Sequence, residues 1–79
     1  LEEKEKEMII EAGRTYVELN SASFTTTRCV SLQTLVDAEL LNEKFIVEAL
    51  GSNYNSTYQI KAVYGANEHT ISLVPAGSC

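Results

Sequence analysis

The first twenty residues contain no proline and one glycine, and they are rich in Glu, Lys, Leu and Ala. These residue types lose little side-chain freedom on a helix, so the stretch predicts a helix over residues 1–20. Its charged start, residues 2–7, is typical of solvated first turns. This helix is the longest element the chain offers, and the remaining residues must supply the surface on which it packs.

At about 100° per residue, the predicted helix has one narrow apolar face. That face, which we expect to pack on a sheet, consists of Met8, Ile9, Ala12, Tyr16 and Leu19. Ile10 and Val17 lie outside it and widen the apolar surface to roughly 200°, more than one sheet normally covers. We therefore expect Ile10 and Val17 to meet a second partner.

The composition is that of a small globular domain, with 79 residues, 44% hydrophobic and 22% charged. The formal net charge of −5 comes from scattered acids, and no basic stripe is present to hold phosphates. Direct binding of nucleic acid is therefore not expected. The sequence has no apolar run near the ~20 residues that a membrane span requires, and no signal-peptide pattern.

The chain has two cysteines, Cys29 and Cys79. Their spacing fits neither a zinc site, which needs four ligands in close pairs, nor a Cys-x-x-Cys redox motif. We predict a disulfide between them, with two unrelated free thiols as the alternative. Such a bridge would fix the end of the chain and would imply an oxidising compartment.

Residues 21–43 form the predicted connection. The Ser/Thr-rich part, 21–28, should end the first helix, with Phe24 folding the loop back onto the core. Ser31 is a good N-cap, and Val30 can contact Leu35 as a hydrophobic staple. A short second helix is therefore expected over residues 32–39.

Residues 44–79 show a period of two and predict an antiparallel sheet with a tail. The expected strands are 45–50, 57–64 and 69–74, separated by the turn residues 51–56 and 65–68. We expect Ile60, Ala62, Ile71 and Leu73 to face inward. The predicted fold class is α+β: one domain with a long N-terminal helix packed on about three antiparallel strands.

The candidate reactive residues do not form a recognisable catalytic pattern. His69 is predicted to be a solvated histidine at a turn, with Glu68 on the other face of the strand. Asp37, Glu39 and Glu43 could supply paired carboxylates, but nothing in the sequence predicts their burial. We expect no metal, no cofactor, no small-molecule substrate and no enzymatic activity.

Tyrosine favours interfaces, so the four tyrosines are a second set of candidates. Tyr16, Tyr58 and Tyr64 have places on apolar faces and are expected in the core. Tyr54 lies in a predicted turn, and its role is left open.

Two segments carry a resemblance to a known family. These are Ala12-Gly-Arg-Thr-Tyr16 and Cys29-Val-Ser-Leu-Gln-Thr-Leu-Val-Asp-Ala-Glu-Leu-Leu41, placed between a charged helix start and a small sheet with a terminal cysteine. In this order they resemble the globular part of small type IV pilins and pseudopilins, especially those of Gram-positive bacteria. The chain departs from that pattern at Glu39-Leu40, where such pilins often carry Gly-Tyr, and it lacks the apolar N-terminal helix and its cleavage signature.

The resemblance implies a structural subunit of a filament on the bacterial cell surface, used in adhesion, motility or DNA uptake. Its partners would be other pilin subunits, and a missing apolar helix upstream of Leu1 would anchor it in the membrane before assembly. Residues 1–20 would be the lower part of the spine helix. Ile10 and Val17 would then be possible subunit contacts.

Two alternatives stay open. The first is a pseudopilin of a type II secretion or competence machine, which would share the same architecture. The second belongs to another class: a small secreted binding or inhibitor domain that uses the turn at residues 51–56, with Tyr54 in the contact.

Overall fold

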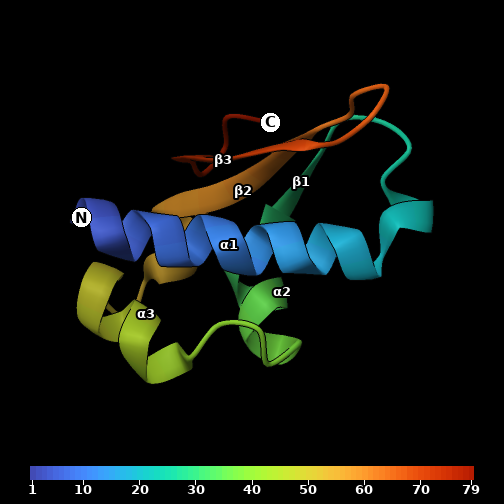
Figure 1. The fold of residues 1–79 in the computed structure, drawn as a ribbon. Coiled ribbons are helices and arrows are strands. Elements are labelled where there is room, and N and C mark those ends of the chain that lie inside the picture. The colour runs from blue at the N-terminus through green and yellow to red at the C-terminus, as the bar shows by residue number, and fades with distance from the viewer.

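The computed structural model describes all of residues 1–79 (Figure 1). In chain order, its elements are helix α1 (Glu3–Leu19), the 3-10 turn η1 (Ser21–Ser23), strand β1 (Arg28–Ser31), helix α2 (Leu32–Asp37), helix α3 (Glu43–Leu50), the 3-10 turn η2 (Tyr54–Ser56), and strands β2 (Tyr58–Val63) and β3 (Thr70–Pro75). The strands form one antiparallel sheet in the order β1-β2-β3. Figure 1 shows the three α-helices on one side of this sheet and the C-terminus on the other. The predicted α+β class, a long N-terminal helix on three antiparallel strands, is confirmed.

The strand predicted over residues 45–50 is wrong, because this segment is helix α3. Asn42 caps the helix: its Oδ1 accepts from the Phe45 N–H at 3.1 Å. Gly51, with φ of 91°, follows the last helical residue, a conformation that glycine adopts at little cost. The buried side of α3 has helical spacing, with Ile46 fully buried and Ala49 and Leu50 half-buried.

The third strand of the sheet comes instead from Arg28–Ser31, which the sequence placed in the connecting loop. β1 pairs antiparallel with β2, with Val30 opposite Ile60. The predicted N-cap that follows it is confirmed, because the Ser31 Oγ accepts from the Thr34 N–H at 3.2 Å. α2 is shorter than the predicted 32–39 and ends at Asp37.

The hairpin of β2 and β3 lies close to its predicted position. Ile60 pairs with Leu73, and Ala62 pairs with Ile71. Ile60, Ala62 and Ile71 are buried while Leu73 is half-buried, so the predicted inward face is confirmed. Ile60 is fully buried on the middle strand, which makes it the centre of the sheet.

The face of α1 that packs on the sheet differs from the predicted one. Its buried residues are Ile9, Ala12, Gly13 and Val17, whereas Met8 and Leu19 are 53% and 71% exposed. At 100° per residue, the buried face is turned by about 60° from the predicted one.

The reason for this rotation is Gly13. A Cβ atom placed there would lie 2.9 Å from the Ile60 Cγ2, so the absence of a side chain lets this face of α1 pack closely on β2. Helices pack where the surface of the partner fits, and a glycine opens such a place without contributing to an apolar pattern.

One cluster of thirteen buried residues joins the helices to the sheet. Its members are Ile9, Ala12, Val17, Phe24, Val30, Leu32, Leu35, Leu41, Ile46, Tyr54, Ile60, Ala62 and Ile71. No charged residue is buried. The inclusion of Phe24 confirms that the Ser/Thr-rich loop folds back onto the core through this ring.

Candidate functional site

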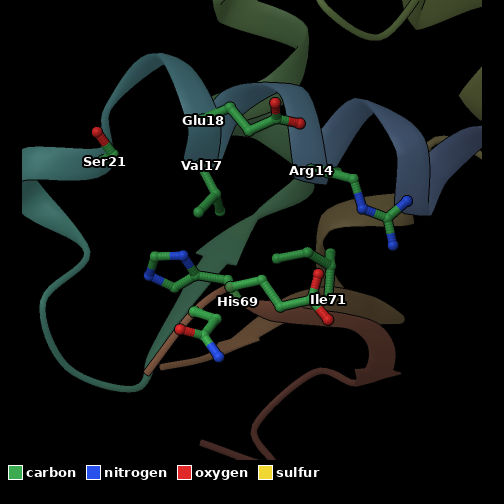
Figure 2. A pocket seen from close by; sticks show the side chains of 8 residues that line it. Arg14, Val17, Glu18, Ser21, His69 and Ile71 are labelled. Atoms are coloured by element: carbon green, nitrogen blue, oxygen red, sulfur yellow. The ribbon is translucent and has the colours of Figure 1, made fainter. Parts of the chain in front are cut away.

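A hollow of about 500 Å³ lies between the second half of α1 and the turn that joins β2 to β3 (Figure 2). Val17 and Ile71 supply its apolar surface. The other lining residues are polar or charged: Arg14, Glu18, Ser21, Asn67, Glu68 and His69. It is lined by the single histidine of the chain, which makes it the candidate site.

His69 is more enclosed than a solvated turn histidine. Its ring is half-buried and makes edge-on contacts with Phe24 and Tyr64, with ring centroids 6.4 Å and 5.5 Å away. The Nε2 atom is hydrogen-bonded to the Phe24 carbonyl, and since a carbonyl can only accept, Nε2 carries the hydrogen. His69 therefore joins the loop after α1 to the loop before β3. The side chain that was predicted to be solvated is therefore half-buried.

The side chains around His69 do not form an acid–base relay with it. Glu68 lines the same hollow, contrary to its predicted place on the other face, but the Phe24 carbonyl is the one hydrogen-bond partner of the imidazole. Arg14 is engaged with Glu11, its Nη1 lying 2.7 Å from the Glu11 Oε2. In Figure 2 the Arg14 and Glu18 side chains extend away from the imidazole. The His69 contacts therefore hold the loop after α1 against the loop before β3.

The three carboxylates singled out by the sequence are not brought together as a pair. Asp37 accepts from the Gln33 Nε2 at 3.0 Å, within α2. Glu43 lies 3.5 Å from the Tyr54 hydroxyl. Glu39 is exposed, with a φ of 62°. No group of three His, Cys, Asp or Glu side chains in the chain is placed to hold a metal ion.

Tyr54, whose role the sequence left open, is a buried anchor. It is 4% exposed, and its hydroxyl donates to the Gln33 Oε1 at 2.9 Å. Burial and then the negative charge of Glu43 raise the pKa of the Tyr54 hydroxyl above its usual value. The binding-domain alternative assigned Tyr54 to a ligand contact, whereas this side chain is buried. Of the other tyrosines, Tyr16 and Tyr58 are half-buried against the core and Tyr64 is 50% exposed, so Tyr64 departs from its predicted core position.

The disulfide between Cys29 and Cys79 is confirmed. Its Cα atoms lie 6.3 Å apart, and the sequence separation is 50 residues. Because Val30 faces the core, the neighbouring Cys29 faces the opposite side of the sheet. The bridge therefore holds the C-terminal tail against the sheet face that the helices leave open.

The chain matches no protein-family model, no curated protein and no solved structure. None of its helices is both long enough and apolar enough to traverse a bilayer.

The two predicted subunit contacts have different surroundings. Val17 is 2% exposed and lies in the core, so packing within the chain already accounts for its apolar side chain. Ile10 is half-buried and stays a prediction. The exposed apolar residues on or next to α1 are Leu1, Met8 and Leu19, which lie within about 20° of one another around the helix axis. The sequence pattern places Met8 and Leu19 on the face that packs on the sheet, whereas the rotation of α1 leaves both exposed.

Proposed function

We propose that the chain is the globular part of a structural subunit in a type IV pilus-like surface filament. The observation that carries the proposal is the uneven burial of α1. From Ile9 onward the helix packs on the sheet, whereas residues 1–8 are exposed apart from the half-exposed Glu5. Figure 1 shows this uncovered end of α1 at the edge of the molecule. A spine helix that continues into a filament core needs an end that its own domain leaves uncovered.

Three further features support the proposal. The exposed apolar residues Leu1, Met8 and Leu19 give α1 a surface for contacts with neighbouring subunits. The disulfide suits an oxidising location outside the cytoplasm. Glu39, at the departure from the pilin pattern, has the left-handed backbone that glycine adopts most easily, so the Gly found in pilins would fit this turn.

The proposal requires an apolar segment of about twenty residues directly upstream of Leu1 in the complete gene product. Sequencing the gene tests this requirement, and a gene without such a segment would refute the proposal. Where the segment is present, deletion of the gene should remove surface fibres seen by electron microscopy, and expression in trans should restore them. Loss of protein secretion or DNA uptake with fibres unchanged would favour a pseudopilin instead.

A further inference from the structure

The two edges of the sheet are protected to different degrees. β1 is four residues long, begins with Arg28 and is tied to the C-terminal tail through Cys29. The Arg28 guanidinium also lies over the Phe24 ring, 4.9 Å from its centroid, and donates to the Ser23 carbonyl at 2.8 Å. Charge, short length and covering segments are the features by which proteins block strand pairing at an edge.

β3 has none of these features. It is six residues long, Thr-Ile-Ser-Leu-Val-Pro, with no charged residue and with proline only at its last position. Its pairing with β2 is continuous, without a bulge. Apart from the Pro75 carbonyl, which accepts from the Ser78 N–H, its residues make no backbone hydrogen bond beyond the strand pairing. In an antiparallel pair alternate residues point their N–H and C=O groups away from the partner, so β3 presents free groups to a further strand.

We infer that β3 pairs antiparallel with β3 of a second copy of this chain, about a twofold axis at Ser72. This register places Ser72 opposite its own counterpart, Ile71 opposite Leu73, and Thr70 opposite Val74. Core-facing residues then lie opposite core-facing residues. A shift by one residue would place core-facing residues opposite residues of the other sheet face. A shift by two in one direction would place Pro75, which has no N–H to donate, opposite Ile71. The same shift in the other direction would pair Leu73 and Val74 with residues that lie outside β3.

The charge distribution limits where two copies of the chain can meet. Each chain carries a net charge of −5, so most surfaces of two copies repel one another. The strand from Thr70 to Pro75 is uncharged, and the pairing places no like charges directly opposite.

α1 lies on one face of the sheet (Figure 1) and does not occupy the hydrogen-bonding edge of β3. At Gly13 it packs against Ile60 on the middle strand, and Ile60 pairs with Leu73 next to the proposed axis. Arg14 and Val17 face Ile71 across the hollow, and Ile10 shares their flank of α1 at helical spacing. A strand added beside β3 would therefore cover more of the half-buried Ile10.

Twofold pairing closes on itself, so it joins two subunits but does not lengthen a filament. The inference therefore goes beyond the proposed function, and it can fail while fibres are still made of this protein.

A charge exchange at Ser72 tests the inference. Sedimentation equilibrium of the oxidised chain should show its mass rising with concentration from 8.7 kDa toward twice that value. Ser72→Lys and Ser72→Glu should each weaken dimerisation by about tenfold or more, because each places like charges face to face. A 1:1 mixture of the two variants should restore a dimer. Thr26→Lys and Thr26→Glu, in an exposed loop, are the matched controls and should behave as the unchanged chain does.

Three outcomes would overturn the inference. The first is a constant 8.7 kDa up to millimolar concentration. The second is dimerisation that the Ser72 charges leave unchanged, which would indicate another contact. The third applies if circular dichroism shows that the Ser72 variants do not fold: a free peptide of residues 69–76 should then shift the amide resonances of β3 in the unchanged chain, and the absence of shifts would refute the pairing.

Discussion

At the residue scale, Gly13 determines how α1 sits on the sheet. Gly13→Ala should destabilise the chain, although alanine favours a helix by about 1 kcal/mol over glycine. The added Cβ would lie 2.9 Å from the Ile60 Cγ2, and Ile60 is fully buried, so its side chain would have to shift within the core. Overpacking of this kind costs about 1 to 3 kcal/mol, so the loss should outweigh the gain. Urea denaturation measures the difference.

The same experiment in an Ile60→Ala background provides the control. That substitution removes the atoms that the new Cβ would meet, so Gly13→Ala should there be neutral or stabilising. If Gly13→Ala stabilises the chain in both backgrounds, the close approach of α1 to β2 is not as described.

Glu39 is a second residue whose backbone departs from the preference of its side chain. Glu39 follows α2 with a φ of 62°. The next N–H, that of Leu40, donates to the Leu35 carbonyl at 3.0 Å, which is the geometry of a helix end that usually carries glycine. Glu39→Gly should therefore raise the free energy of unfolding by about 1 kcal/mol. Glu39→Ala retains the strain and should give no such gain in a thermal or urea melt. Equal melting of the two variants would contradict this explanation.

At the element scale, sequence patterns located most helices and strands but not every one. α1, the cap of α2 and the hairpin of β2 and β3 follow from residue types, spacing and turns. Phe45 to Leu50 is a short apolar run in which alternation and helical spacing cannot be told apart. The Asn42 cap and Gly51 were the signals that favour a helix there. β1 is only four residues long, and its pairing with β2 depends on contacts distant in sequence.

The candidate site was less predictable for the same reason. His69 and Glu68 stand out in the sequence, but the hollow also needs Arg14, Val17 and Glu18 from α1. Their approach to β3 depends on the rotation of the helix at Gly13. A pattern within one helix does not report the shape of its partner surface.

The Tyr54 hydroxyl contacts Gln33 of α2 and Glu43 of α3. Its ionisation in alkaline solution should therefore lower the stability of the fold. Its pKa is raised by burial and by Glu43, and the folded chain therefore holds this proton more tightly than the unfolded chain does. This stabilisation is fully present below pH 10.0, the usual pKa of a tyrosine, and is lost as the pH rises above it. Tyr54→Phe should abolish that part of the alkaline loss of stability.

Ultraviolet titration of the tyrosines checks this directly. The absorbance change that occurs at the highest pH should disappear in Tyr54→Phe and persist in Tyr64→Phe, whose ring is half exposed. Persistence of that change in Tyr54→Phe would show that another residue is responsible.

At the scale of the whole molecule, the disulfide contributes much of the stability of a small domain. Closing a loop of about fifty residues is worth about 4 kcal/mol in the chain-entropy model. Replacing both Cys29 and Cys79 by alanine should therefore lower the urea midpoint strongly, and a reducing agent should have the same effect on the unchanged chain. A midpoint unaffected by either would show that the tail contributes nothing to the fold.

The architecture as a whole is a helix whose second half packs on a sheet and whose first turns are left uncovered. The central claim is that this arrangement coats a surface filament, with α1 directed into its core. The most direct test is immunogold electron microscopy of cells that carry the gene, with an antibody raised against residues 1–79. We predict gold particles along the whole length of surface fibres and none on cells in which the gene is deleted. Fibres that carry no label on cells shown to produce the protein would contradict the claim.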